Sequence, residues 1–265
     1  MTRSLEGLRV LVTRPAPQGE RLVAAIREAG GAALAFPLLE IRKLDREPSS
    51  VVVFDHLDGF DIAIFISTNA VRAALACWRE RAGAWPATLM CLGIGSATAK
   101  ALAEEGIVAA SAAAAMNSEE LLALDVLAGV EGRRIVIFKG AGGRDLLATS
   151  LAARGARVTE CALYRRVAPA LPPAELARRL AKDGFDTVLI SSAEGFANLL
   201  GLLGRDLAGT MAGGITLVVP GERVAQLARA SGFMRLEIAA NATDEAMLAA
   251  LHALAARNRA ESEHS

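Results

Sequence analysis

The chain has 265 residues, of which 53% are hydrophobic and 22% charged, so its composition is that of a globular protein and excludes a disordered one. Its length allows two domains, each with a buried core of its own. The 29 basic and 29 acidic residues give a net charge of zero, which argues against nucleic acid as the main partner.

Short apolar runs alternate along the chain with longer helical stretches. Each run is apolar almost throughout, which is typical of strands covered on both faces by helices. The runs are residues 9–13, 62–67, 90–94, 135–139, 187–191 and 215–219, and the helical stretches are 19–29, 69–81, 96–105, 144–154, 193–203 and 222–230. This repeated alternation predicts an α/β fold with parallel sheets and right-handed crossovers.

Landmarks of the first half of the chain recur in the second half at a nearly constant offset. We interpret this order as an internal duplication into two similar lobes, with a ligand cleft expected between them. The corresponding segments are 7–14 and 132–139, 59–67 and 184–191, 95–106 and 221–232, and 118–120 and 243–245.

Two segments interrupt the alternation at equivalent positions of the two repeats, residues 36–41 and 161–166. Both are extended in character and flanked by polar or proline-rich sequence, so we expect them to be paired linkers between the domains. The polar tail after Arg257 is expected to fray.

The cysteine pattern and the apolar segments indicate in which cellular compartment the protein is found. The three cysteines are scattered through apolar sequence, which indicates reduced core thiols and no disulfide framework. The start of the chain lacks the apolar region of a signal peptide, and the longest apolar stretch, 107–116, is far shorter than a membrane span. We therefore expect a cytoplasmic protein without membrane contact.

Open parallel sheets bind ligands beyond the carboxyl ends of their strands, against helix N-termini. Small hydroxyl residues and glycines occupy these positions here, and the exposed N–H groups and helix dipole suit carboxylates or phosphates. At any single position the hydroxyl is better explained as a helix N-cap. Six such ends together favour anion binding. The residues concerned include Thr13, Arg14, Ser67, Thr68, Asn69, Ser96, Lys139, Arg144, Ser191 and Ser192.

Several familiar motifs are absent. Gly93-Ile94-Gly95 lacks the third glycine of a dinucleotide fingerprint, and residues 140–143 lack the ending of a phosphate-binding P-loop, which disfavours a nucleotide-dependent transferase. The three histidines are isolated and have no ligand partner at useful spacing, so we expect no metal, no cofactor and no Ser–His catalysis.

Tyr164 is the only tyrosine of the chain and ends one of the two extended segments. Its hydroxyl either points into the cleft between the lobes or belongs to a core tyrosine with a satisfied hydroxyl. The spacing alone favours the core tyrosine over a hydroxyl in the cleft.

A series of short motifs runs in order along nearly the whole chain, at residues 10–15, 31–32, 37–41, 66–71, 93–99, 142–147, 164–166 and 243–247. In these motifs and their order the chain resembles the uroporphyrinogen-III synthase family, which closes the tetrapyrrole ring in haem, sirohaem and cobalamin synthesis. It differs from many members of that family at Lys139-Gly140-Ala141, where they have arginine, glycine and asparagine.

The resemblance implies two flavodoxin-like domains joined by a two-stranded linker. Residues 1–36 with 167–265 would form a discontinuous first domain and 37–166 the second, with linker strands at about 36–42 and 160–166. The duplication alone would have indicated two contiguous halves.

The implied reaction converts hydroxymethylbilane to uroporphyrinogen III, with loss of water and inversion of ring D. The electron-rich pyrrole expels its own hydroxymethyl oxygen, so the reaction needs neither metal nor cofactor. Tyr164 would donate to, or orient, the leaving hydroxyl. The substrate's carboxylates would be bound by Arg14, Ser67, Thr68, Asn69, Ser96, Lys139, Arg144, Ser191 and Ser192.

The expected partner is the small tetrapyrrole substrate, with hydroxymethylbilane synthase as a transient protein partner and the chain itself a monomer. The alternative is a non-catalytic two-lobe binding module for a small polyanion, which would share the fold and the anion-binding strand ends. A turnover assay that resolves the product isomers distinguishes the two.

Overall fold

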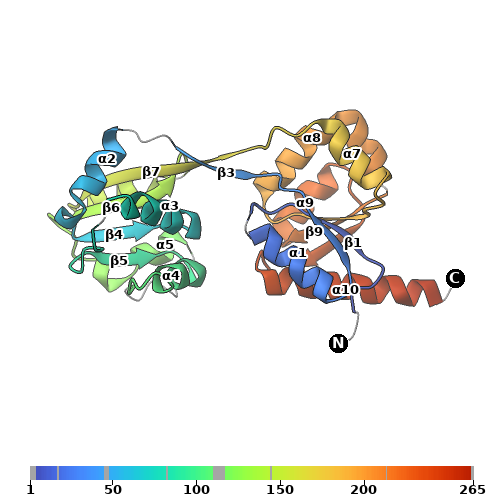
Figure 1. Cartoon of the computed structure of the whole chain (residues 1–265), viewed down its shortest axis with the longest axis horizontal. Coiled ribbons are helices and arrows are strands. Elements are labelled where there is room, and N and C mark those ends of the chain that lie inside the picture. The colour runs from blue at the N-terminus through green and yellow to red at the C-terminus, as the bar shows by residue number, and fades with distance from the viewer. Residues whose placement is uncertain are drawn as a thin grey trace. The chain divides into compact units, whose positions relative to one another are not determined.

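The computed structural model describes residues 4–16, 18–44, 48–81, 83–109, 117–143, 145–212 and 214–263. The chain divides into two compact units (Figure 1). Unit 1 consists of Met1–Glu40 and Val167–Ser265, and unit 2 consists of Ile41–Arg166.

Unit 1 is built on a five-stranded sheet in which all neighbouring strands are parallel. Its order is β10-β9-β8-β1-β2, which is the 2-1-3-4-5 order of flavodoxin-like folds. The strands are β1 (Arg9–Val12), β2 (Ala32–Ala35), β8 (Thr187–Leu189), β9 (Thr216–Pro220) and β10 (Leu236–Ala239).

Helices cover both faces of this sheet because its strands are apolar on both sides. Leu11 of β1 packs with α7 (Pro173–Ala181), α8 (Ala193–Ala212) and α9 (Glu222–Ala230). Val10 and Val12, which alternate with Leu11, pack with α1 (Gln18–Glu28) and α10 (Asp244–Glu263) on the other face.

Unit 2 has the sheet order β3-β7-β6-β4-β5. Its strands are β3 (Glu40–Lys43), β4 (Ile62–Phe65), β5 (Met90–Gly93), β6 (Arg134–Gly140) and β7 (Arg157–Val167). Helices α2 (Pro48–Asp55), α3 (Thr68–Arg79) and α4 (Ser96–Ala103) contribute to the core cluster on one face, and α5 (Ser118–Leu122) and α6 (Leu146–Ala153) to the cluster on the other.

The two sheets share one strand order when repeat-equivalent strands are compared. The repeat in the sequence pairs β1 with β6 and β4 with β8, and by position β2 with β7 and β5 with β9. Unit 1 contains the order β2-β1-β8-β9, and unit 2 contains β7-β6-β4-β5. Each sheet therefore combines the first two strands of one repeat with the following strands of the other.

The chain passes between the units at two neighbouring strands, β3 and β7 (Figure 1). The unit boundaries fall at Glu40/Ile41 and Arg166/Val167, at the start of β3 and near the end of β7. The prediction of two flavodoxin-like parallel-sheet domains with a two-stranded connection is confirmed.

The prediction of a frayed tail after Arg257 is wrong over the described residues, because α10 continues to Glu263. Met247 and Leu251 bury one face of this helix in the core, and Arg259 donates to the Ser4 carbonyl oxygen at 2.9 Å. The predicted helix 193–203 ends where expected, because Gly204 has a non-helical φ of 67° and ψ of 171°, and a second helical segment then continues α8 to Ala212.

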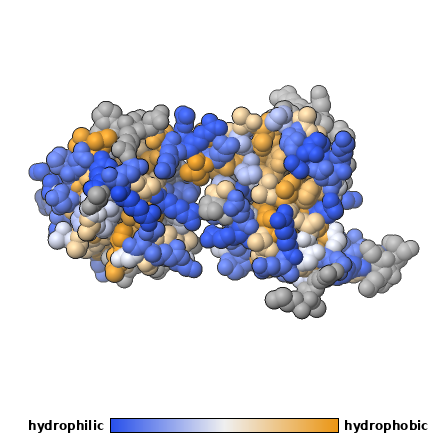
Figure 2. All heavy atoms as spheres, viewed as in Figure 1, coloured by the Kyte–Doolittle hydropathy of each residue, from blue (hydrophilic) through white to orange (hydrophobic). Residues whose placement is uncertain are grey.

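On the face shown in Figure 2, hydrophilic residues are interspersed with hydrophobic ones over both units. No helix among the described residues is both long and apolar enough to span a membrane. The exposed large hydrophobic side chains are Val52, Met90, Val108, Leu146, Leu227, Met234 and Ile238.

Candidate functional site

The centre of the unit 2 sheet has the geometry at which flavodoxin-like folds bind ligands. Strands β4 and β6 are neighbours, and the chain leaves them toward opposite sides of the sheet order, to β5 and to β7. Ligands bind beyond the carboxyl ends of strands at such a switch point. Ser67 follows β4 there, and Lys139 lies at the end of β6.

Ser67 is the N-cap of α3. Its backbone is extended, with φ −168° and ψ 164°, and its Oγ accepts a hydrogen bond from the Ala70 N–H at 3.1 Å. Thr68 and Asn69 are the first residues of the helix, and all three side chains are half-buried. The local sequence Ser-Thr-Asn therefore serves as a helix start, as the N-cap interpretation predicts.

Tyr164 of β7 reaches this helix start from inside the core. The residue is only 1% exposed, and its Oη lies 2.8 Å from Ser67 Oγ. The ring lies against Gly140, where an added Cβ would be 2.8 Å from ring atom Cε2. Glycine at position 140 thus leaves the space that the ring occupies.

Lys139 is held by carboxylates of the protein itself. Its Nζ lies 2.6 Å from Glu160 Oε1 and 3.4 Å from Asp145 Oδ1. Burial lowers the pKa of Lys139, but the hydrogen bonds and charges of Glu160 and Asp145 outweigh it, and the net pKa is raised. The positive charge is therefore matched before any ligand arrives.

A cavity of about 310 Å³ opens beside this ion pair. Its acidic residues, Glu119 and Glu160, outnumber its single base, Lys139, so the cavity offers no excess positive charge to a carboxylate. It is lined by Ile66, Ile94, Asn117, Ser118, Glu119, Ile137, Lys139, Leu147 and Glu160.

Unit 1 carries the equivalent switch point between β1 and β8. Ser191 and Ser192 follow β8, and Ser192 Oγ accepts from the Gly195 N–H at 3.0 Å, so Ser192 caps the start of α8. The Arg14 guanidinium follows β1 and binds the Asp244 carboxylate and the Ala242 carbonyl oxygen.

Arg14 is buried, and its counter-charge Asp244 is half-buried. Burial lowers the pKa of its guanidinium, against the opposing effect of Asp244, yet an arginine stays charged at neutral pH. Like Lys139, Arg14 is occupied within its own unit, where it fixes the end of β1 to the start of α10.

Ser96 opens α4 as an exposed residue, and the N-cap before it is Gly95 with a φ of +80°. The backbone conformation of Gly95 lies in the left-handed region that favours glycine. Arg144, the remaining predicted binding residue, lies outside the described residues.

The structure thus divides the predicted residues between two sheet edges. Ser67, Thr68, Asn69, Ser96, Lys139 and Tyr164 belong to unit 2, and Arg14, Ser191 and Ser192 belong to unit 1. Two of them, Ser67 and Tyr164, are in direct contact. Sequence reasoning missed Glu160, Asp145 and Asp244, although a lysine at the end of an apolar run, such as Lys139 in β6, indicates a partner of opposite charge.

Two of the cysteines are poorly suited to be nucleophiles. Burial raises the pKa of Cys91 to about 11 and that of Cys161 to about 12, so both are protonated at neutral pH. Within the described part of the chain, no group of three or more His, Cys, Asp or Glu side chains is arranged to hold a metal ion.

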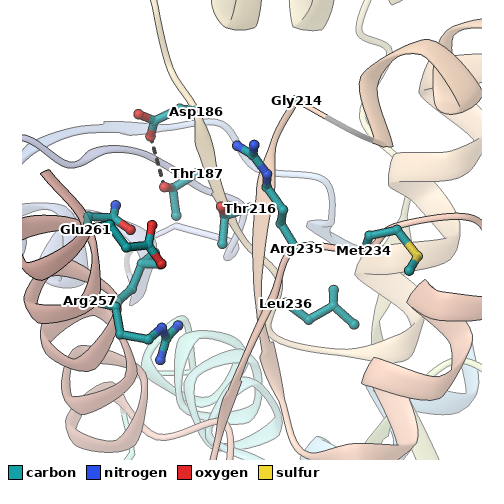
Figure 3. A pocket seen from close by; sticks show the side chains of 11 residues that line it. Asp186, Thr187, Gly214, Thr216, Met234, Arg235, Leu236, Arg257 and Glu261 are labelled. Carbon is teal, nitrogen blue, oxygen red and sulfur yellow. Dashed lines mark hydrogen bonds between the residues drawn. The ribbon is translucent and has the colours of Figure 1, made fainter. Parts of the chain in front are cut away.

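A second cavity, of about 400 Å³, lies at the opposite, amino-terminal ends of β8, β9 and β10 (Figure 3). Arg257 and Glu261 project into it from α10, and Thr187 donates to Asp186 Oδ1 at 2.9 Å. Two carboxylates and two guanidinium groups line it, so it has no preference for one sign of charge.

The chain is similar to known proteins over most of its length. The family model described as uroporphyrinogen-III synthase HemD matches residues 20–249. The uroporphyrinogen-III synthase of Salmonella typhimurium is 35% identical over 243 residues, which cover 91% of this chain and 99% of that protein. The enzyme of Escherichia coli is 34% identical over the same shares.

Solved structures show the same fold. A mutant uroporphyrinogen III synthase from Thermus thermophilus matches with a TM-score of 0.63 at 20% identity, covering 95% of this chain and all of that one. A uroporphyrinogen-III synthetase from Helicobacter pylori matches with a TM-score of 0.57 at 16% identity, covering 93% of this chain and 99% of the other.

Proposed function

Because this chain belongs to the uroporphyrinogen-III synthase family, we propose that it converts hydroxymethylbilane to uroporphyrinogen III, with loss of water and inversion of ring D. The observation that carries this function is identity of 34–35% with named synthases over 91% of the chain. The chain is accordingly an enzyme, a lyase of tetrapyrrole biosynthesis.

The reaction depends more on control of the substrate's geometry than on a strong acid, base or nucleophile. Loss of the hydroxymethyl oxygen gives an azafulvene, which is attacked at the substituted carbon of ring D. The spiro intermediate then fragments and recloses with that ring inverted. Free bilane closes without inversion, so the protein must favour one approach over the other.

We assign the departing hydroxyl to the region of Tyr164. The Tyr164 hydroxyl lies at the end of the central strands of unit 2, bonded to the helix cap Ser67. A hydrogen-bond donor at this place would stabilise the oxygen as the C–O bond breaks.

We assign the substrate's carboxylates to the helix starts. The residues concerned stand at N-termini of helices, where N–H groups and hydroxyls donate hydrogen bonds to anions without a net positive charge on the chain: Thr68, Asn69, Ser96, Ser191 and Ser192. Arg14 and Lys139 are already paired with Asp244 and Glu160, so we assign them the task of holding strand ends in place. Arg144 stays a predicted carboxylate ligand.

The assay is direct. Hydroxymethylbilane is generated by hydroxymethylbilane synthase in the same cuvette, and the oxidised products are resolved chromatographically into type I and type III isomers. Type III product above the uncatalysed background supports the function. Binding of a tetrapyrrole product without turnover would support a non-catalytic binding module in its place.

Transient contact with hydroxymethylbilane synthase and a monomeric state remain predictions. A short-lived substrate that closes to the wrong isomer in solution favours direct transfer. Sedimentation velocity of the chain alone, and of the chain mixed with that synthase, measures both.

A further inference from the structure

Ser67 stands between a buried tyrosine and the edge of the sheet. Its Oγ accepts from the Ala70 N–H at 3.1 Å and lies 2.8 Å from Tyr164 Oη. Ser67 is half-buried at the end of β4, whereas Tyr164 is only 1% exposed. A ligand at the sheet edge therefore meets Ser67 before it meets Tyr164.

Counting protons fixes the direction of the Ser67–Tyr164 hydrogen bond. A serine hydroxyl offers one proton and two lone pairs, and the Ala70 amide fills one lone pair because it can only donate. A buried tyrosine O–H that failed to donate would cost about 1–3 kcal/mol. Tyr164 avoids this cost by donating to the second lone pair of Ser67. The Ser67 proton is then left to point outward.

The two hydrogen bonds that Ser67 Oγ accepts strengthen the one that its own O–H can donate. A hydroxyl that accepts hydrogen bonds is polarised and becomes a better donor. The amide belongs to the first turn of α3, a helix of 12 residues whose positive dipole end acts in the same direction.

We propose that Ser67 is the catalytic residue that donates a hydrogen bond to the departing hydroxyl of hydroxymethylbilane, and that Tyr164 is a positioning residue that acts through Ser67. The C–O electron pair goes to the oxygen while the pyrrole nitrogen supplies the electrons of the new exocyclic C=C bond. The ring N–H then yields its proton, so that water leaves and the serine is unchanged. This inference rests on the proposed function.

The test compares four variants in the isomer-resolving turnover assay. Ser67→Ala removes the donor and should lower kcat about 10²-fold, the usual cost of one such donor, with little change in KM. Ser67→Thr keeps the hydroxyl and the cap, and should restore most of the turnover. Tyr164→Phe should lower kcat less than Ser67→Ala does. The double variant should be no worse than Ser67→Ala alone.

A matched control separates catalysis from loss of the helix cap. Thr243 Oγ1 accepts from the Ala246 N–H at 3.3 Å, with the same spacing of three residues as Ser67 and Ala70. Thr243→Ala removes this cap in unit 1 and should lower the melting temperature, as Ser67→Ala does, while turnover per folded molecule stays near that of the unaltered chain.

The single tyrosine also allows a readout without substrate. In the Raman spectrum, the intensity ratio of the two bands of the tyrosine doublet is low when the phenol donates a hydrogen bond and high when its oxygen accepts one. No other tyrosine contributes to this signal. A donor signature that is lost in Ser67→Ala supports the inference. An acceptor signature in the unaltered chain overturns it.

Kinetic outcomes can overturn it too. Near-normal turnover by folded Ser67→Ala, or a larger loss in Tyr164→Phe than in Ser67→Ala, would mean that Tyr164 itself touches the substrate. Absence of turnover by the unaltered chain would instead overturn the proposed function, and the Raman doublet would still show which way the hydrogen bond runs.

Discussion

Glu160 neutralises Lys139 at the end of β6, with 2.6 Å between carboxylate Oε1 and ammonium Nζ. The two partners differ in exposure, since the Lys139 side chain is 8% exposed and that of Glu160 is 38% exposed. If the pair is broken, water can therefore solvate the Glu160 carboxylate far more easily than the Lys139 ammonium.

We predict that Glu160→Gln destabilises the protein more than Lys139→Met does. The first variant leaves a buried ammonium with only Asp145 nearby and should cost about 1–3 kcal/mol, reduced from the fully buried case by solvent around Glu160. The second leaves a carboxylate that water reaches. Urea unfolding of both variants measures the difference, and equal losses would contradict the prediction.

The stabilisation by the Lys139–Glu160 ion pair should also depend on pH. The pKa of Lys139 is raised in the folded protein above its ordinary value of 10.5, so its contribution is complete below that pH and is lost as pH rises through the folded pKa. As pH rises above 10.5, the unaltered chain should therefore lose more stability than Lys139→Met does. If the free energies of unfolding of the two proteins fell in parallel with pH, folding would not raise the pKa of Lys139.

Gly140→Ala should destabilise unit 2 through Tyr164. The added Cβ would lie 2.8 Å from Cε2 and 2.9 Å from Cζ of a ring that is packed in the core and cannot withdraw. Overpacking of this kind costs about 1–3 kcal/mol. Combining the change with Tyr164→Ala should cost less than the sum of the two single changes. Strict additivity in thermal unfolding would mean that the two residues do not meet.

Alanine at Thr68, Ser96, Ser191 or Ser192 should leave kcat nearly unchanged in each case. Backbone N–H groups at the same helix starts would continue to bind the substrate's carboxylates, and one neutral hydrogen bond is worth about 0.5–1.5 kcal/mol, or roughly tenfold in KM at most. Steady-state kinetics of the four variants checks this. A folded variant with no turnover would identify a discrete catalytic hydroxyl at that position.

Asp244→Asn should destabilise unit 1 specifically. The variant leaves the buried Arg14 guanidinium without its carboxylate partner and removes a negative charge from the first turn of α10. A loss of about 1–3 kcal/mol is expected because Asp244 is partly exposed. Hydrogen exchange should show faster exchange in β1 and α10 and unchanged exchange in β4 and β6.

The fold was largely predictable because its signals are local. The strand 135–139 and the helix 222–230 coincide with β6 and α9 to within one residue, since apolar runs and capping glycines define them. The tail after Arg257 was mispredicted, because the order of α10 depends on contacts with Ser4 and Glu237 that no local pattern reveals.

The site was predictable in its residue types and not in its pairings. Ser67 and Tyr164 were both singled out, yet their hydrogen bond joins residues 97 positions apart and depends on β7 lying beside β6. Lys139 and Arg14 were expected to offer positive charge to a ligand. Only the three-dimensional arrangement shows that Lys139 and Arg14 are already ion-paired, with Glu160 and Asp244 respectively.

The exchange of strands between the repeats has a consequence for how a growing chain can fold. Unit 2 is one continuous segment, whereas β1 of unit 1 must pair with β8, and the hydrogen bond from Thr13 Oγ1 to the Leu189 carbonyl oxygen joins residues 176 positions apart. A nascent chain that ends near residue 170 can complete the unit 2 sheet but holds only the β1–β2 pair of unit 1, and two strands are too few to be stable alone. The segment synthesised first is therefore the last to find its place, and its apolar strand β1 stays exposed to other partners until synthesis has passed β8.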